Sequence, residues 1–333
     1  MVNMPSQLID KFNRKITYVR MSVIDRCDFR CVYCMDEKMT FLPRAQILTL
    51  EELEWLGRAF VELGVTKIRI TGGEPLVRQN ILKLFQGLGS LEGLKELVLT
   101  SNGSQLVKMA QPLKEAGVKR INISLDSLKP DRFKKMTRIG KLDVVLRGIE
   151  AALKAGFKRV KLNAVILKNR NHDEVTDLVQ FAIEHDIDIT FIEEMPLGMI
   201  GEHDRAEAFY SSAQIRQDLE ESFTLLPSAE TTAGPSRYYR VIDTNTRVGF
   251  ISPHSHNFCD TCNRVRVTTE GRLLLCLGQE HSVDLRRVIR ANPGDFVLLK
   301  QAIIKAMAIK PKGHDFELDD QPQILRYMNA TGG

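Results

Sequence analysis

The sequence has no long apolar run and no strong excess of charge. Nowhere in its 333 residues does an uninterrupted apolar segment approach the length that spans a bilayer, and the opening MVNMPSQLIDKFNRK has no signal-peptide pattern. The formal net charge of +5 is too small to indicate a nucleic-acid coat, although it leaves room for a local basic pocket. We therefore expect a cytoplasmic protein that works without a membrane and without nucleic acid.

Cysteine is also scarce, and none of the six cysteines lies outside two groups of three. The groups are Cys27, Cys31 and Cys34, and Cys259, Cys262 and Cys276. In a reducing cytosol this grouping indicates metal or redox chemistry rather than disulfides. Neither group has the fourth cysteine of a closed zinc site. An iron-sulfur cluster held by three thiolates would leave one iron open to another ligand.

The middle of the chain repeats one pattern around three glycines, Gly64, Gly117 and Gly156. Each reads as the end of a helix with a left-handed glycine cap, followed by a short turn and a β-branched strand. Further strands are expected near residues 18–23, 96–100 and 187–193. About six strands that alternate with helices predict an α/β fold with a parallel sheet.

Polar residues recur at matching positions inside these strands, where a sheet buried on both faces would be apolar. Arg69, Asn122 and Lys161 each lie five residues after one of the three repeat glycines. Two residues further on in the same strands come Thr71, Ser124 and Asn163. The first strand has a similar polar pair, Arg20 and Ser22. Taken singly, each could be a rim residue. Because side chains alternate along a strand, the shared habit predicts one wet, cationic face that suits a ligand with phosphates.

The first cysteine group has the spacing C-X3-C-X2-C with Tyr33 before its last cysteine, and Thr71 begins the stretch TGGEP at a strand end. Both features resemble the radical S-adenosylmethionine superfamily. The resemblance implies a partial or complete TIM-like barrel. It also implies a 4Fe-4S cluster whose open iron is chelated by the amino and carboxylate groups of S-adenosylmethionine.

The second group can be interpreted in two ways. A zinc knuckle would need completion by His254, His256 or His281. With the first motif beside it, however, the stretch FCDTCNRVRVTTEGRLLLCL, the strand FIEEMP from Phe191 and the terminal Gly332 and Gly333 closely resemble the MoaA family of GTP 3',8-cyclases in molybdenum cofactor biosynthesis. This resemblance runs over essentially the whole chain from about residue 20.

The family resemblance implies an architecture in two parts. Residues 12–215 would form an incomplete TIM-like (β/α)6 barrel with the first cluster. Residues 216–333 would form a smaller extension with strands at 238–242 and 248–251, a helix at 297–310, the second 4Fe-4S cluster and the Gly-Gly tail.

The resemblance also implies roles for individual residues. Cluster ligands would be Cys27, Cys31 and Cys34, and Cys259, Cys262 and Cys276. S-adenosylmethionine would contact Tyr33, Gly73, Ser124 and Met195. GTP would contact Arg20, Arg69, Thr100, Lys161, Arg264, Val265 and Arg266. The residues expected in catalysis are Arg20, Arg264, Arg266, Gly332 and Gly333. Without the resemblance, Arg264 and Arg266 would read as a solvated edge strand and the tail as a frayed end.

The implied reaction converts GTP to 3',8-cyclo-7,8-dihydroguanosine triphosphate. The implied partners are an electron donor such as flavodoxin or ferredoxin, the downstream cyclic pyranopterin monophosphate synthase and, in a homodimer, a second copy. Thr190 departs from the family, which commonly has arginine there. His314 has no motif around it and is expected at the surface.

Two alternatives stay open on the sequence. A peptide-maturing radical enzyme with an auxiliary cluster would act on a protein, although such enzymes tend to carry more cysteines in the auxiliary region. A zinc-stabilised nucleic-acid-binding protein would use the basic residues on a surface, yet these residues fall inside predicted strands.

Overall fold

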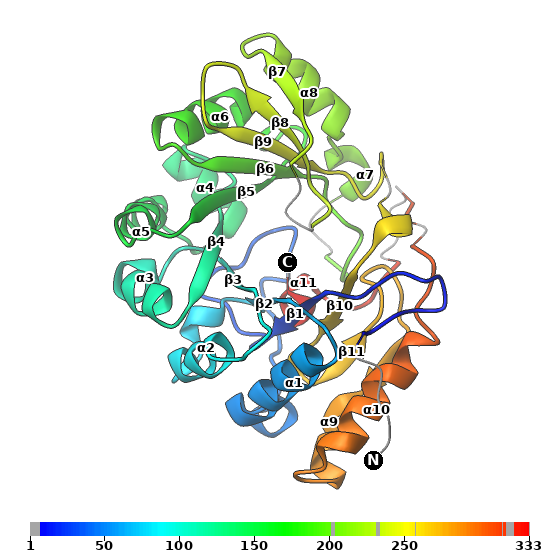
Figure 1. Cartoon of the computed structure of the whole chain (residues 1–333). Coiled ribbons are helices and arrows are strands. Elements are labelled where there is room, and N and C mark those ends of the chain that lie inside the picture. The colour runs from blue at the N-terminus through cyan, green and yellow to red at the C-terminus, as the bar shows by residue number, and fades with distance from the viewer. Residues whose placement is uncertain are drawn as a thin grey trace.

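The structure, a computed structural model, describes residues 7–200, 204–230, 234–256, 258–314, 316–317 and 323–332. Its central feature is one sheet with the strand order β12-β11-β10-β1-β2-β3-β4-β5-β6-β9-β8-β7 (Figure 1). The strands are β1 Tyr18–Ser22, β2 Lys67–Thr71, β3 Glu96–Ser101, β4 Val118–Ser124, β5 Arg159–Val165, β6 Asp188–Ile192, β7 Leu225–Ser228, β8 Arg237–Val241, β9 Arg247–Ile251, β10 Arg264–Val267, β11 Arg272–Leu274 and β12 Ser282–Asp284.

Strands β1 to β6 lie side by side in chain order, and each pairs in parallel with the next. Strand β10 adds to β1 and β9 adds to β6, again in parallel. The outer strands pair antiparallel, β11 and β12 on one side and β8 and β7 on the other. Within the described residues the sheet therefore has two ends, at β12 and β7, and does not close on itself.

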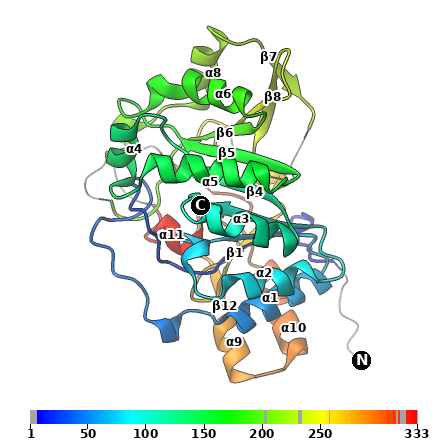
Figure 2. The same cartoon turned by 90° about the vertical axis from the view of Figure 1, so that its left-hand side faces the viewer.

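The helices either connect these strands or, in the case of the last three, follow β12. They are α1 Leu50–Glu62, α2 Ile81–Gly89, α3 Leu106–Glu115, α4 Pro130–Thr137, α5 Leu142–Lys154, α6 Val175–Glu184, α7 Arg205–Ala208, α8 Ser212–Glu220, α9 Leu285–Ala291, α10 Phe296–Met307 and α11 Met328–Thr331. Figure 1 shows the strands along an arc with helices α1 to α6 on its outer side, and α11 within the arc. In the turned view, α11 again lies beside β1 near the middle of the molecule (Figure 2).

Helix α1 illustrates why the sequence folds this way. Thr49 caps it in a complete capping box, because its hydroxyl accepts from the backbone of Glu52 while the Glu52 carboxylate accepts from the backbone of Thr49. Its apolar stripe, which includes Leu56 and Phe60, is fully buried in the core. Gly57 lets α1 approach α2 closely, since a Cβ there would lie 2.3 Å from the side chain of Leu88.

The predicted α/β architecture is confirmed. The three repeat glycines all adopt left-handed conformations, with φ angles of 88°, 92° and 69° at Gly64, Gly117 and Gly156. The expected strand pair appears as β8 and β9, and the expected late helix as α10. Both β9 and β10 come from the predicted extension yet join the same sheet as β1 to β6; the division after residue 215 stays a prediction. No helix in the described ranges combines the length and the apolar character needed to cross a bilayer.

Candidate active site

Two adjoining pockets are lined by side chains from the parallel strands and by the two cysteine groups. The first, called the cationic pocket here, is lined by basic residues and by the second cysteine group: Tyr18, Arg20, Lys67, Arg69, Lys161, Arg264, Arg266, Cys259, Cys262 and Cys276. The second, called the glycine-loop pocket, is lined by the first cysteine group and its surroundings: Cys27, Cys31, Cys34, Tyr33, Gly72, Gly73, Thr100, Ser124 and Asp126. Asn163, Ile192, Met195 and Met328 line both, so the two pockets adjoin.

The alternation predicted along the strands places these side chains. Arg69 lies beside Arg20 in the β1–β2 register, and Lys161 lies beside Asn122 in the β4–β5 register. All four line the cationic pocket. Two residues further on, Thr71 and Ser124 line the glycine-loop pocket. The predicted cationic face is therefore confirmed at these positions and continues from one pocket into the other, whereas Ser22, which was predicted on it, lines neither pocket.

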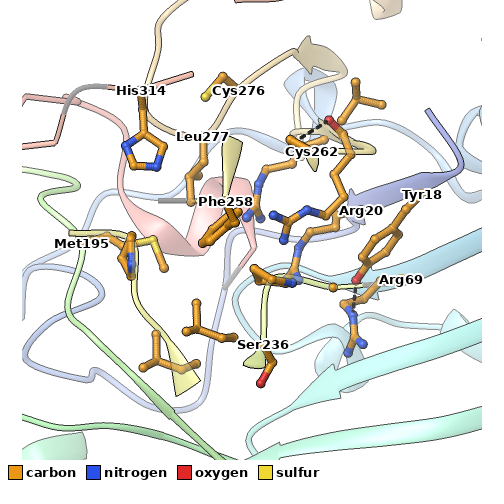
Figure 3. Close-up of a pocket in the computed structure, with 18 of the residues that line it drawn as sticks. Tyr18, Arg20, Arg69, Met195, Ser236, Phe258, Cys262, Cys276, Leu277 and His314 are labelled. Carbon is orange, nitrogen blue, oxygen red and sulfur yellow. Dashed lines mark hydrogen bonds between the residues drawn. The ribbon is translucent and has the colours of Figure 1, made fainter. Parts of the chain in front are cut away.

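Hydrogen bonds fix the basic side chains at one end of the cationic pocket. Arg69 donates from Nε to the hydroxyl of Tyr18 at 2.6 Å (Figure 3). A terminal nitrogen of Arg69 donates to Thr100 Oγ1 at 2.9 Å. Lys161 Nζ donates to the hydroxyl of Tyr238 at 3.2 Å. These bonds hold Arg69 and Lys161 in place in the pocket.

The pocket is an unfavourable place for so many positive charges. Burial is the main cause that lowers the pKa of Arg20 to about 10 and that of Lys67 to about 8. Burial, followed by repulsion from Arg20 and Arg264, lowers the pKa of Arg266 well below its usual range. A ligand with several negative charges would relieve this repulsion, so the electrostatics favour a polyphosphate.

The last turn of the chain reaches this pocket. The backbone oxygen of Gly332 accepts from Arg266 at 2.7 Å and from Arg20 at 3.5 Å. Gly332 has a φ of 75°, and a Cβ there would lie 2.1 Å from Thr71 Cγ2, so only glycine fits. Gly332 thus touches two of the arginines predicted to act in catalysis, whereas Gly333 lies outside the described residues.

The glycine loop holds the chain that leads into the first cysteine group. Gly73 donates from its backbone to the oxygen of Ile24 at 2.7 Å, and Glu74 donates to that of Arg26 at 2.9 Å. A Cβ on Gly73 would lie 2.3 Å from the Arg26 oxygen, so the approach requires glycine. The carboxylate of Glu74 accepts from the backbone of Asn102 at 2.6 Å, which ties the loop to the end of β3.

The thiols of the first group are free and partly buried. Burial raises the pKa of Cys27 and Cys31 well above the ordinary value and that of Cys34 to about 12. Without metal these cysteines are therefore neutral thiols, which lose their protons when a metal binds. Next to them, Tyr33 donates its hydroxyl to Asp126 at 2.7 Å.

In the second group, burial raises the pKa of Cys276 as in the first group, but Cys262 has a different electrostatic setting. Burial opposes ionisation of Cys262, but the charges of Arg264 and Lys310 outweigh it and lower the pKa of this thiol. Lys310 is almost fully buried, and its Nζ lies 3.9 Å from Cys262 Sγ. Arg14 donates to the backbone oxygen of Cys259 at 2.7 Å. The buried cations Lys310 and Arg14 thus lie next to this group, where their charge stabilises thiolates that carry a cluster.

The donor set fits iron-sulfur clusters better than zinc. In the described part of the chain, no three His, Cys, Asp or Glu side chains converge on the position of one metal ion. A closed zinc site needs such convergence, whereas the thiolates of a 4Fe-4S cluster bind different irons at its corners. The geometry thus gives no support to a zinc knuckle completed by His254, His256 or His281.

The predicted residues divide between the pockets. Arg20, Arg69, Lys161, Arg264, Val265 and Arg266 line the cationic pocket, and Tyr33, Gly73 and Ser124 line the glycine-loop pocket. Met195 lines both. Thr100, expected at GTP, lines the glycine-loop pocket instead, although it binds Arg69.

Several features were not predicted. Tyr18 and Lys67 line the cationic pocket, and the period of two that singled out Arg20 and Arg69 would have found both. The expected surface position of His314 is wrong, because His314 is only 8% exposed and lines the same pocket. Thr190 is buried on β6, and its hydroxyl has no hydrogen-bond partner among the described residues.

Comparisons with known proteins agree with this site. Proteins named GTP 3',8-cyclase are 60% identical in Saccharophagus degradans, over 98% of this chain and 99% of that protein, and 63% identical in Pseudomonas entomophila, over 99% of each. Another with that name in Pseudomonas putida is 64% identical, over 98% of each chain.

The domain-level and structural comparisons point the same way. Residues 21–182 match the Radical SAM superfamily, and residues 187–316 match the family called Molybdenum Cofactor Synthesis C. The fold is similar to that of Streptococcus suis SuiB bound to S-adenosylmethionine, with a TM-score of 0.63 and 15% identity over 96% of this chain and 79% of SuiB. With relatives at least 60% identical over nearly its whole length, the chain belongs to the GTP 3',8-cyclase family of the radical S-adenosylmethionine superfamily.

Proposed function

We propose that the protein is a GTP 3',8-cyclase, which converts GTP to (8S)-3',8-cyclo-7,8-dihydroguanosine 5'-triphosphate in the first step of molybdenum cofactor biosynthesis. The observation that carries this proposal is the pair of adjoining pockets. Each contains three cysteines, and one of them also contains at least six basic residues, which include Arg20, Lys67, Arg69 and Lys161. This arrangement suits a polyphosphate substrate held next to a radical source.

We propose that Cys27, Cys31 and Cys34 hold one 4Fe-4S cluster, and that Cys259, Cys262 and Cys276 hold a second. When bound and reduced, the first cluster would supply the electron for cleavage of S-adenosylmethionine to methionine and a 5'-deoxyadenosyl radical, which would remove the hydrogen at C3' of GTP so that this carbon can bond to C8 of guanine. A second electron from the external donor and one proton from solvent would complete the dihydro product. Tyr33, Gly73, Ser124 and Met195 would contact S-adenosylmethionine.

The protein's own residues then act by positioning. The forked guanidinium groups of Arg20, Arg69, Arg264 and Arg266 suit the paired oxygens of a triphosphate, and Lys161 adds a point charge. Thr100 acts through Arg69, which it holds by a hydrogen bond. Gly332 lies between Thr71 and the arginines, so the tail would fill space between the two substrates and exclude water.

The wider context follows from the same proposal. The arc formed by β1 to β6 and their helices would be an incomplete TIM-like barrel over residues 12–215, closed on its open side by residues 216–333. Free thiols and oxygen-sensitive clusters belong in a reducing compartment, so a cytoplasmic location is proposed. A flavodoxin or ferredoxin would supply electrons, the product would pass to cyclic pyranopterin monophosphate synthase, and a homodimer is the proposed assembly.

An anaerobic reconstitution tests the proposal. The loaded protein is analysed for iron and sulfide, then mixed with reductant, S-adenosylmethionine and GTP. We expect about eight irons per chain, since each cluster carries four, and formation of 5'-deoxyadenosine together with a cyclised nucleotide.

Two matched variants separate the clusters. Cys27→Ser should abolish cleavage of S-adenosylmethionine, whereas Cys259→Ser should retain some cleavage but lose cyclisation of GTP. If guanine nucleotides neither bind nor react while both clusters are intact, the substrate is wrong. Activity on a peptide would instead support the peptide-maturing alternative, and bound zinc with salt-sensitive nucleic-acid binding would support the other alternative.

A further inference from the structure

Tyr18 lies in the cationic pocket with positive charge on every side. It is only 3% exposed and sits on β1, where its register partners are Lys67 on β2 and Arg264 on β10. Its hydroxyl accepts from Arg69, and Figure 3 shows its ring directed toward that arginine with Arg20 nearby. The Nζ of Lys67 lies 4.9 Å from the ring centre.

We propose that the phenol oxygen of Tyr18 is an internal substitute for a substrate phosphate. In the nucleotide-free enzyme it would, as an anion, bind Arg69 and balance the charges of Arg20 and Lys67; when a triphosphate enters, it would give up this role and take one proton from solvent. This proposal rests on the proposed function, because it assumes that a triphosphate binds in the cationic pocket.

The charges around Tyr18 support an anionic phenol. Its own strand contributes Arg20, β2 contributes Lys67 and Arg69, and β10 contributes Arg264 and Arg266. The nearest carboxylate on β3, that of Glu96, bonds to Lys67 at 3.0 Å and to Arg120 at 3.0 Å, so it is already shared between two cations.

The energetics agree with this geometry. Burial alone would raise the pKa of Tyr18, but the charges of Arg69, Arg20 and Lys67 outweigh it and lower this pKa to about 6. The 2.6 Å bond from Arg69 has the length of a charge-assisted hydrogen bond. A phenolate is therefore the expected form at neutral pH.

A bound triphosphate would reverse this preference. Its oxygens compete with the phenolate for the same donors, and its negative charge opposes a second anion in the same pocket. The pKa of Tyr18 should then return toward its ordinary value of about 10. Charge and protons balance, since one proton from solvent converts the phenolate to a phenol.

The test measures tyrosinate absorbance and not total proton uptake. Lys67, with its pKa lowered to about 8, could also take up protons when triphosphate binds, so proton uptake alone would not identify Tyr18. Inorganic triphosphate is the probe, since it has no absorbing base. It is added to the cluster-loaded protein at about pH 7 without S-adenosylmethionine or reductant. We expect the near-ultraviolet tyrosinate absorbance of about one residue per chain to disappear on binding.

Two variants assign the signal. Tyr18→Phe should lack it, whereas Tyr239→Phe should keep it, because the hydroxyl of Tyr239 bonds to Arg216 away from the pocket. In the wild type at pH 7, the need to protonate a phenol of pKa about 6 lowers the affinity for triphosphate about tenfold. Tyr18→Phe needs no such protonation and should therefore bind triphosphate up to about tenfold more tightly. A residue with only a structural role would give no tyrosinate signal.

Each outcome decides the question. Triphosphate that binds to wild-type protein without loss of tyrosinate absorbance would overturn the proposal, as would weaker binding in Tyr18→Phe. If Tyr18→Phe does not fold, the wild-type absorbance change alone decides. Failure of both GTP and inorganic triphosphate to bind a fully loaded wild type would overturn the proposed function and this inference together, which distinguishes it from failure of the inference alone.

Discussion

The substitution Gly332→Ala should undock the end of the chain from the site while the rest of the fold stays intact. Gly332 has a φ of 75° and a ψ of 120°, a sparsely populated conformation that costs an L-residue about 1–3 kcal/mol. The new methyl would also lie 2.1 Å from Thr71 Cγ2, and Thr71 is buried on β2 and cannot move aside easily.

The structure gives the scale of the effect. The bond from Arg266 to the Gly332 oxygen involves a charged donor and is worth about 1.5–3 kcal/mol, which is comparable with the dihedral cost alone. With the clash added, the ratio of docked to undocked tails should fall by a factor of at least about 5–30, as 1–2 kcal/mol implies. The free energy of unfolding should change by less than about 1 kcal/mol, because the tail can leave without disturbing the sheet.

The assay measures cyclised nucleotide per 5'-deoxyadenosine formed, together with release of terminal residues by carboxypeptidase. Gly294→Ala is the matched control, since Gly294 has a φ of 83° but lies between α9 and α10, where an added methyl would have nothing within 4 Å. Thr71→Ser removes the nearest of the three clashing Thr71 atoms, so the double variant should recover part of the loss relative to Thr71→Ser alone. A Gly332→Ala protein with wild-type coupling and an equally protected tail would refute the reasoning.

Three other substitutions test separate parts of the structure. Thr190→Val removes a buried hydroxyl without a described partner, so the melting temperature should hold or rise; weaker GTP binding would instead make this hydroxyl a substrate contact. Arg247→Met leaves Asp188 buried without its 2.5 Å partner and should cost about 3–5 kcal/mol in denaturant unfolding, whereas the exposed control Arg216→Met should cost less than about 1 kcal/mol. Burial raises the pKa of Glu74 to about 7, so the folded state binds this proton more tightly than the unfolded state does. The free energy of unfolding should therefore fall as pH rises from about 4.5 through about 7. Glu74→Gln should flatten that slope, and an unchanged slope would contradict the assignment.

Much of the fold could be predicted because its signals are local. A glycine in the left-handed conformation, a β-branched strand and a capped helix each depend on a few neighbouring residues, as at Gly64 and Gly117. The order of strands β1 to β6 then follows from the rule that successive βα units lie side by side. The position of β9 and β10 at opposite ends of that row could not be predicted this way, because it depends on pairing between distant segments.

The site was predictable to the same extent. The period of two placed Arg69 and Lys161 in one pocket without any reference to a family. In contrast, the burial of His314 and the contact between Gly332 and Arg266 arise where the end of the chain folds back across the sheet. No local pattern encodes such a contact. The roles of the cysteines and of the GTP and S-adenosylmethionine contacts remain predictions until the variants above are measured.

Strand β10 pairs with the outer edge of β1, and β9 pairs with the outer edge of β6. This pairing has a consequence for the synthesis of the protein. While a ribosome is still synthesising the last third, the emerged β1 and β6 both present bare backbone donors and acceptors, the condition that promotes strand-to-strand aggregation. Premature termination after β6 should therefore yield insoluble material rather than a smaller working piece. We therefore expect the first cysteine group to receive iron only after β9 and β10 have paired with those edges.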